Sequence, residues 1–200
     1  MRKVELLSPA KNVDVAIAAI NNGADAVYIG GPAFGARKAV GNSLEDIEKA
    51  VRYAHRFYCR VFVTLNTILY DEELPEVERL IHGLYKIGVD AIIVQDPAVL
   101  KLDLPPIALH ASTQMHNYDL ERIKFLDRLG FQRVVLAREL SLAQLREIRR
   151  EVKAELEYFV HGALCVSLSG QCYMSHYLTN RSANRGECAQ ACRMRWTVED

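Results

Sequence analysis

The feature that most constrains this chain is a regular alternation of short apolar runs with longer amphipathic stretches. The apolar runs are rich in Val and Ile and predict seven strands, at residues 3–8, 26–30, 60–66, 91–96, 107–112, 133–139 and 156–162. Apolar residues at three-to-four spacing predict helices at residues 12–22, 43–57, 72–87, 119–129 and 141–152, with Ser43 and Ser141 as N-caps. Strands that alternate with helices in this way are typical of a parallel sheet.

Three helix-to-strand junctions share one local form, in which a glycine follows the helix and a strand begins about two residues later. They read "NNGADAVYI", "KIGVDAIIV" and "RLGFQRVVL", so Gly23, Gly88 and Gly130 are expected in the left-handed conformation that ends a helix. No G-x-G-x-x-G follows the first strand. The repeat therefore favours an α/β fold of the TIM-type (β/α)8 barrel over a doubly wound sheet.

A closed barrel of this type needs an eighth strand, and only seven are visible. Either "RWTVE" (195–199) begins the eighth strand or the chain is an N-terminal fragment of a longer protein, and we favour the fragment. Residues 1–162 are expected to form barrel units one to seven. Residues 163–200 are expected to form a cysteine-rich segment at the C-terminal face of the barrel.

Charge and hydropathy limit the partners of the chain. Its 25 Lys and Arg residues balance 25 Asp and Glu residues, which excludes a broad basic surface for coating nucleic acid or an anionic membrane. Any contact of that kind must be local. The first residues carry too few apolar side chains for a signal peptide, and no run reaches membrane-spanning length, so we expect a soluble cytoplasmic protein with no membrane partner.

Polar side chains cluster at the predicted strand ends, where a barrel carries its active site. In isolation each could merely cap a helix or a turn, but polar residues close six of the seven predicted strands, which favours a functional site. The candidate substrate contacts are Asn66, Gln95, Asp96, Gln114 and Asn117, and the candidate catalytic residues are His110, Arg138, Glu139 and His161. Arg138 is the natural partner for a carboxylate or a phosphate.

Four of the five cysteines, Cys165, Cys172, Cys188 and Cys192, lie within 28 residues beyond the seventh predicted strand. An odd number of cysteines in a reducing compartment argues against disulfides. The spacing is compatible with an iron–sulfur cluster or a structural zinc ion, and inert small residues are the plainer alternative.

A catalytic thiol is a further alternative, because His161 precedes Cys165 by four residues and His176 follows Cys172 by the same interval. Four cysteines exceed what that chemistry uses. The fifth, Cys59, is expected to pack in the core.

The stretch "ELEYFVHGALCVSLSGQCYMS" (155–175) resembles the signature of peptidase family U32, the collagenase-like peptidases. The matching positions are Glu157, Phe159, Gly162, Ala163, Leu164, Cys165, Gly170, Cys172, Met174 and Ser175. The blocks "LLSPAKN", "GADAVYIGGPAFGAR", "VQDPAV", "LHASTQMHN", "VVLARELS" and "RSANRGECAQACR" follow in the family order. The resemblance covers essentially the whole chain.

This resemblance implies a TIM-type barrel whose cysteines hold a 4Fe-4S cluster. It implies hydroxylation of a tRNA wobble uridine, of a cytidine in large-subunit rRNA, or of the ubiquinone ring, with prephenate as a metabolite that the RNA-modifying members require. By position, Cys165, Cys172 and Cys188 carry over as ligands, and Cys192 completes the set unless the fourth ligand lies beyond residue 200.

The family label of peptidase finds little support in the residues. No H-E-x-x-H, G-x-S-x-G or aspartic dyad motif is present, and thiolates that bind iron cannot also attack an amide. We therefore rank an RNA hydroxylase first and a collagenase-like peptidase as the alternative. A ubiquinone-type hydroxylase and a redox partner without its own activity stay open, as does a protein partner or a homo-oligomer.

An RNA substrate has a local candidate surface. Arg181, Arg185, Arg193 and Arg195 lie among the cysteines, and Arg37 follows the second strand; these arginines are expected to hold phosphates. Tyr173, Tyr177 or Trp196 would stack an unpaired base. A solvated, salt-bridged loop is the plainer interpretation of the same charges.

Overall fold

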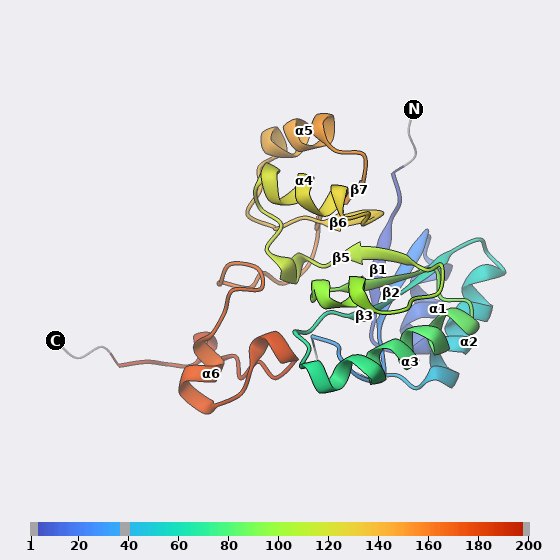
Figure 1. Ribbon diagram of the computed structural model, residues 1–200, viewed down its shortest axis with the longest axis horizontal. Helices are drawn as coiled ribbons and strands as arrows, with labels where there is room; N and C mark the ends of the chain where they lie inside the picture. The colour runs from blue at the N-terminus through green and yellow to red at the C-terminus, as the bar shows by residue number, and fades with distance from the viewer. Residues whose placement is uncertain (1–3, 37–40, 198–200) are drawn as a thin grey trace.

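The computed structural model describes residues 4–36 and 41–197 and contains one parallel sheet of seven strands in sequential order (Figure 1). The strands are β1 (Leu7–Ala10), β2 (Ala26–Gly30), β3 (Arg60–Leu65), β4 (Ala91–Val94), β5 (Ala108–Ala111), β6 (Arg133–Val135) and β7 (Glu155–Glu157). Each strand pairs in parallel with the next along the chain. Sequential order with helices between is the arrangement of a TIM-type barrel, here a curled half-barrel, which confirms the predicted fold class.

All five predicted helices are present, within a few residues of their predicted ends. They are α1 (Val13–Asn21), α2 (Leu44–His55), α3 (Leu74–Lys86), α4 (Leu120–Arg128) and α5 (Leu142–Glu151), and a short α6 (Met174–Thr179) follows in the cysteine-rich segment. Five 3-10 helices complete the described part: η1 (Asp71–Glu73), η2 (Pro97–Lys101), η3 (Thr113–Met115), η4 (Ala183–Arg185) and η5 (Ala191–Arg193). Over these residues, no helix is both long and apolar enough to cross a membrane.

The predicted caps and junction glycines are confirmed. Ser43 accepts a hydrogen bond from the Asp46 amide at 3.1 Å, and Ser141 forms a capping box with Gln144. The three junction glycines, Gly23, Gly88 and Gly130, have φ angles of +98°, +87° and +91°. Glycine adopts this left-handed conformation without the steric cost that a side chain adds.

Three predicted strand boundaries are wrong. The first strand was expected from residue 3 but begins at Leu7, because the Leu6 amide bonds the Asp25 carboxylate at 2.9 Å instead of a neighbouring strand. The sixth stops at Val135 rather than at residue 139, since the Ala137 amide turns away to the Asn117 carbonyl at 3.0 Å. The seventh is Glu155–Glu157 rather than 156–162, and no strand forms over 195–197, the described part of "RWTVE".

The two faces of the sheet pack differently. Side chains that point outward, such as Val61, Val63 and Ile92, join the helices in the main apolar core. Cys59 is buried in this core, as predicted, and its thiol donates to the Ala24 carbonyl at 3.1 Å. The inward side chains form a second, small cluster around Phe62, Ala26, Ala91 and Ile93. Alternation between faces follows from the two-residue period of a strand.

A network of charged side chains lies at the N-terminal end of the lumen. Arg133 opens β6, is 5% exposed, and donates to Glu5 at 2.7 Å and to Glu157 at 3.3 Å. It also pairs with Glu155, which opens β7, and Arg60, which opens β3, pairs with Glu5. Burial raises the pKa of the Glu157 carboxyl, and Arg133 opposes that shift.

Candidate functional site

Polar side chains at the C-terminal mouth of the barrel link neighbouring loops. Asn66 accepts from the Ala36 amide at 2.9 Å and donates to Ser112 Oγ at 3.3 Å. Asp96 accepts from the amides of Leu69 and Ala98, each at 2.9 Å. The predicted contacts Asn66 and Asp96 therefore order the mouth, and their direct contact with a substrate stays a prediction.

Asn117 and its neighbours in the β5 loop are held in the same way. Asn117 is fully buried and donates to the carbonyls of Ser112 and Val135, each at 2.8 Å. Gln95 is 7% exposed and donates to the Gln114 carbonyl at 3.4 Å, while its Oε1 has no hydrogen-bond partner among the residues described. A buried acceptor without a donor is suited to bind water or a polar ligand group.

His110 lies deeper, on the inward face of β5. It is 3% exposed, and its ring meets the Phe62 ring edge-on with the centroids 4.7 Å apart. Burial, together with the nearby charges of Arg133 and Arg60, lowers the pKa of His110 to about 3. The imidazole is therefore neutral near neutral pH and is suited to hydrogen bonding rather than to donating a proton as an imidazolium ion.

The cysteine-rich segment docks across the mouth beside β5 and β6. Ser169 is 3% exposed, and its amide and hydroxyl donate to the two Glu139 carboxylate oxygens at 3.1 and 3.4 Å. Next to it, Gly170 has φ +71°, and a Cβ atom there would lie 1.8 Å from the Gln114 carbonyl oxygen. Only glycine permits so close an approach. In Figure 1 the segment lies at the end of the barrel to which the β5 arrow points.

A second attachment joins the segment to the loop between β3 and α3. Arg185 donates to the two Glu73 carboxylate oxygens at 2.6 and 2.9 Å and to the Ile68 carbonyl at 2.7 Å. Its guanidinium also lies 4.1 Å from the centroid of the Tyr70 ring. The hydrogen bond from Arg185 holds the pKa of the Glu73 carboxyl below its usual value, and Glu73 in turn raises the pKa of Arg185. Arg185, predicted as a phosphate contact, is thus engaged by the barrel, and contact with substrate stays a prediction.

The four clustered cysteines are free thiols, three of them exposed and Cys172 partly exposed. Cys188 Sγ accepts from the Gln190 amide at 3.4 Å and lies 3.9 Å from Ser175 Oγ, which donates to it. Amides directed at sulfur are typical of the surroundings of iron–sulfur ligands. Arg193 donates to the Leu164 carbonyl at 3.4 Å, which joins the stretch around Cys192 to the stretch around Cys165.

The four clustered thiols are of the chemical type that binds an iron–sulfur cluster or a zinc ion. Among the residues that the structure describes, no three His, Cys, Asp or Glu side chains lie close enough together to hold a metal ion. Within the same residues, no hydrogen bond joins His161 to Cys165 or His176 to Cys172.

A cleft of about 310 Å³ lies between the end of β6 and the cysteine-rich segment. Its lining brings together three predicted site residues, Arg138, Glu139 and Cys165, with Ser167 and the apolar side chains of Leu164, Val166 and Leu168. The Arg138 guanidinium lies 6.0 Å from the centroid of the Phe159 ring and makes no ion pair within the described ranges. His161 is exposed and is not part of this lining. A single guanidinium in a cleft of this size is suited to a small anionic ligand.

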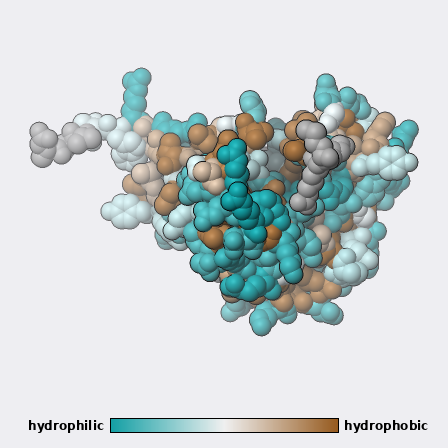
Figure 2. All heavy atoms as spheres, turned by 90° about the horizontal axis from the view of Figure 1, so that it is seen from above, coloured by the Kyte–Doolittle hydropathy of each residue, from teal (hydrophilic) through white to brown (hydrophobic). Residues whose placement is uncertain are grey.

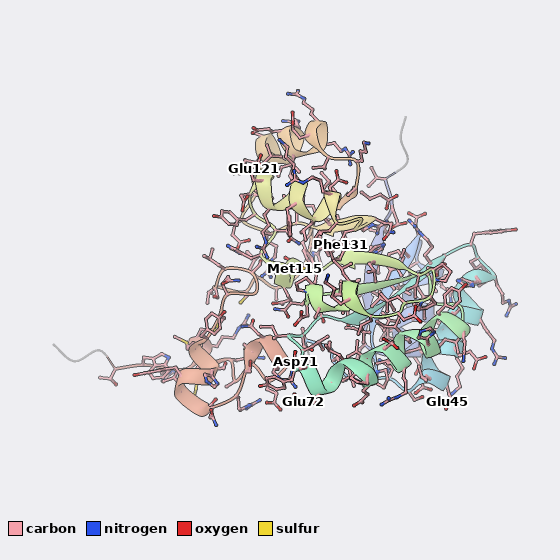
Figure 3. The ribbon with its side chains drawn as sticks, viewed as in Figure 1. Glu45, Asp71, Glu72, Met115, Glu121 and Phe131 are labelled. Carbon is pink, nitrogen blue, oxygen red and sulfur yellow. The ribbon has the colours of Figure 1, made fainter. Side chains whose placement is uncertain are left out.

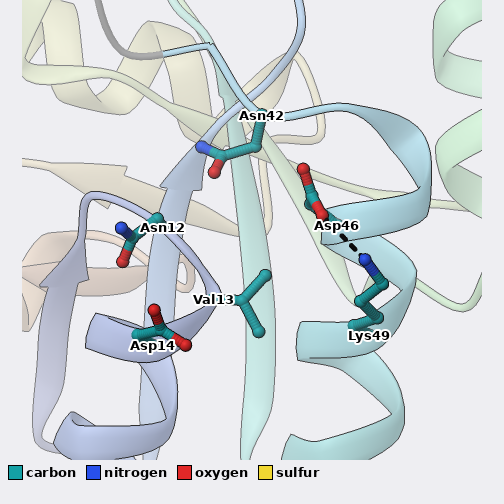
Figure 4. Close-up of a pocket in the computed structure, with 6 residues that line it drawn as sticks. All are labelled: Asn12, Val13, Asp14, Asn42, Asp46 and Lys49. Atoms are coloured by element: carbon teal, nitrogen blue, oxygen red, sulfur yellow. Dashed lines mark hydrogen bonds and ion pairs between the residues drawn. The ribbon is translucent and has the colours of Figure 1, made fainter.

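A second hollow, of about 300 Å³, lies between the N-terminal ends of α1 and α2 (Figure 4). Asn12 caps α1 through the Val15 amide at 3.1 Å, and Lys49 pairs with Asp46 at 3.0 Å. These side chains serve the helix ends, and the hollow contains no thiol. Arg37, the remaining predicted contact, lies outside the described residues.

The cysteine-rich segment exposes both aromatic and basic side chains. Tyr177 is 89% exposed and Trp196 is 57% exposed, and the Trp196 ring is fixed by a 2.9 Å hydrogen bond from Nε1 to the Ala191 carbonyl. Arg181, Arg193 and Arg195 are exposed as well. Figure 2 shows hydrophobic residues interspersed with hydrophilic ones on this face, including the part near the C-terminal end. Apolar surface interspersed with arginine is suited to unpaired nucleotides.

Sequence reasoning missed the partners that hold the segment in place. Glu73 reads as an ordinary first-turn acid of a helix, and Ser169 as a loop residue. The charged lumen could have been predicted from the sequence. Glu155 and Glu157 are two positions apart on a strand, so both point to the same face, and that face should be buried.

Comparison with known proteins identifies a family, two relatives and a solved structure with the same fold. A family model described as peptidase family U32 matches residues 11–200. The chain is 58% identical over 198 residues to the 23S rRNA 5-hydroxycytidine C2501 synthase of Escherichia coli (strain K12), covering 99% of the chain and 30% of that protein. It is 37% identical over 196 residues to tRNA hydroxylation protein P1 of Bacillus subtilis (strain 168), covering 96% of the chain and 46% of that protein.

The chain thus spans less than half the length of either of these two relatives. Among solved structures, the U32 peptidase Mk0906 aligns with a TM-score of 0.66 and 15% identity, over 79% of this chain and 70% of that one. At that identity the alignment shows a shared fold.

Proposed function

Because this chain belongs to peptidase family U32, we propose that it acts in the hydroxylation of a pyrimidine base of RNA, with a cytidine of large-subunit rRNA as the first candidate substrate. The observation that carries this proposal is the identity with the hydroxycytidine synthase over nearly the whole chain. The lower identity with the tRNA hydroxylation protein makes the tRNA wobble uridine the second candidate. Either RNA substrate would place the protein in the cytoplasm.

The proposed cofactor is a 4Fe-4S cluster held by Cys165, Cys172, Cys188 and Cys192, with a zinc ion as the alternative. The support is chemical: four free thiols lie in one segment at the barrel mouth, and one sulfur already accepts an amide hydrogen bond. Such a cluster supplies one-electron transfer when it is bound. The protein's own part is to attach the segment to the barrel through Ser169 and Gly170.

The cleft beside Cys165 is the proposed site of a small anionic co-substrate. Prephenate, which the family resemblance implies, carries carboxylates that the Arg138 guanidinium would bind. The exposed rings of Tyr177 and Trp196 would stack the target nucleotide and its neighbour, and Arg181 and Arg193 would hold phosphates. In this scheme Glu139 holds the segment in place through Ser169, and His110 orders the lumen in its neutral form.

A peptidase is the second candidate, favoured by the fold shared with a protein described as a U32 peptidase. Within the described residues, however, no histidine bonds any of the four clustered thiols, so a cysteine nucleophile activated by a neighbouring base is not assembled there. Hydrolysis of a collagen-derived peptide by the purified protein, unchanged by substitution of the four cysteines, would favour this candidate over the hydroxylase.

The test of the proposed function is a gene deletion followed by mass spectrometry of nucleosides from purified rRNA and tRNA. Loss of 5-hydroxycytidine from rRNA, restored by the wild-type gene but not by Cys165→Ser, is the expected result. Cys59→Ser is the matched control, since Cys59 lies in the core, away from the segment. Unchanged rRNA and tRNA would remove RNA as the substrate and leave quinone hydroxylation, a redox subunit or a peptidase.

Iron and acid-labile sulfide in the anaerobically purified protein test the cofactor separately. Cys165→Ser is expected to lose iron that Cys59→Ser retains. Stoichiometric zinc in place of iron would overturn the cluster. Sedimentation of the same preparation would show whether the protein is a homo-oligomer.

A further inference from the structure

The cysteine-rich segment depends on a small number of contacts for its position on the barrel. On the β5–β6 side it is held by Ser169 and Gly170. From there it runs through α6 to η4, where it meets the loop that precedes α3. In Figure 1 this orange-to-red part lies beside the start of α3, and Figure 3 labels Asp71 and Glu72 at that junction.

The contact at η4 is specific in its geometry. The two guanidinium nitrogens of Arg185 face the two carboxylate oxygens of Glu73 in a bidentate pair, and one of them also donates to the Ile68 carbonyl. The Ile68 amide donates in turn to the Asn184 carbonyl at 3.1 Å, and Asn184 is 5% exposed. Side-chain and backbone bonds thus join the same two stretches, 68–73 and 184–185. A bidentate pair fixes orientation as well as distance.

The same contact lies close to a predicted cluster ligand. Arg185 ends η4, Gly186 turns the chain with φ +81°, and Cys188 follows two residues later. On the barrel side, Glu73 also accepts the Tyr70 amide at 2.8 Å, so the carboxylate is itself fixed by the start of α3. The rigid end of a barrel helix is therefore linked to Cys188 through one ion pair and a three-residue turn.

We propose that Arg185 and Glu73 form a clamp that positions Cys188 at the barrel mouth. The clamp deepens the proposed function, on which it rests, because it assigns two positioning residues to the thiolate site. It also assigns Arg185 to structure instead of to RNA phosphate, and it leaves the exposed arginines Arg181, Arg193 and Arg195 as candidate phosphate contacts. Lysine cannot replace Arg185, since one ammonium group cannot face both oxygens and the Ile68 carbonyl in the same plane.

The experiment compares Arg185→Lys and Glu73→Gln with two matched controls, Arg181→Lys and Glu72→Gln, in the purified protein. Glu73→Gln keeps one oxygen for the Tyr70 amide, but it removes the charge and replaces the second acceptor of Arg185 by an NH2 donor. Hydrogen exchange followed by mass spectrometry reports residues 66–73 and 183–190, which contain the Ile68 amide and the turn to Cys188. Both test variants should exchange about tenfold faster there, with the α1 and α2 peptides unchanged.

The visible absorption and electron paramagnetic resonance spectra of the anaerobic protein are the second readout. The test variants should change these spectra and lower the iron content, while both controls keep wild-type values. Wild-type exchange rates in both test variants would overturn the clamp. Faster exchange with an unchanged spectrum and iron content would overturn the positioning of Cys188.

The same data separate the clamp from the function on which it rests. A wild-type protein without iron would overturn the proposed cofactor, and the exchange rates would still decide whether the clamp exists. If a single variant fails to fold, the exchanged pair Glu73→Arg with Arg185→Glu replaces it. That pair should restore protection of residues 66–73 relative to either single exchange, and no restoration would count against the clamp.

Discussion

Replacing Arg133 by methionine is expected to destabilise the barrel more than any other single change to the charged lumen. Arg133 is 5% exposed and lies 3.3 Å from the Glu157 carboxylate, which is 16% exposed. At that separation and an effective dielectric constant of about 20, two unit charges attract by about 5 kcal/mol. Breaking a buried pair by removing one partner costs about 3–5 kcal/mol, because the other charge stays buried. Arg133→Met should lower the free energy of unfolding by that amount.

A second substitution and a change of pH test whether the lost stability comes from the Glu157 charge that Arg133→Met leaves without its partner. Arg133→Met with Glu157→Gln removes both charges and should recover most of the loss, since a buried neutral pair costs far less than a lone charge. In wild-type protein, burial already holds the pKa of Glu157 above its usual value, and Arg133 opposes this. Without Arg133 that pKa rises further. The penalty is therefore present above the raised pKa and is relieved as the pH falls through it.

Urea unfolding followed by far-ultraviolet circular dichroism measures these differences at about pH 7 and about pH 5. The gap in unfolding free energy between wild type and Arg133→Met should narrow at the lower pH. Glu155→Gln is the control, since that carboxylate is 49% exposed and its pair with Arg133 is worth little. A gap below about 1 kcal/mol, or an equal gap at both pH values, would refute the reasoning.

Three further predictions concern the lumen and the cysteine-rich segment. Gly170→Ala should detach the cysteine-rich segment and lower its protection from proteolysis, because the new Cβ would lie 1.8 Å from the Gln114 carbonyl oxygen. Gly162→Ala, at φ +127° in open space, is the control, and equal protection from proteolysis in the two variants would contradict the clash. His110, with a pKa of about 3, should show no titration of its ring carbons by NMR at neutral pH, and a midpoint near the ordinary value of about 6.5 would show that it is not buried. Trp196→Ala should weaken binding of single-stranded RNA by about 1–3 kcal/mol, measured by fluorescence anisotropy. Tyr58→Ala is the control, because it removes a 97% exposed ring on the junction before β3 and should leave the affinity unchanged. Equal RNA affinities of the two variants would contradict stacking on Trp196.

The local parts of the fold were predictable from the sequence because they depend on local chemistry. Helix ends follow from caps such as Ser43 and Ser141 and from glycines that need a positive φ, and both are visible in a few letters. Strand ends were missed where a distant group decides them. The apolar run from 133 continues to Leu136 and Ala137, yet the Asn117 carbonyl takes the Ala137 amide and ends β6. No window around residue 137 contains that information.

The candidate site shows the same division between features that are visible locally in the sequence and features that depend on distant residues. Thiols, the mouth arginine Arg138 and the acid Glu139 could be named from residue type and position, and the structure gathers Arg138, Glu139 and Cys165 around one cleft. What could not be named are pairings across the chain. Arg185 reads as a phosphate contact until Glu73, 112 positions away, is found facing it. Residue type predicts what a side chain can bind, whereas only the fold decides which partner is within reach.

The two ends of the lumen differ in whether their polar groups are paired within the protein. This difference predicts whether a substitution changes stability or function first. At the N-terminal end, Arg133 and its carboxylates are paired with one another, so substitutions there should change stability first. At the C-terminal end, Gln95 and the cleft around Arg138 retain polar groups without protein partners among the described residues. Buried polar groups without a protein partner are satisfied by water or by a ligand, so at the mouth they are available to bind one. Substitutions of Gln95 or Arg138 should therefore change function before they change the unfolding free energy.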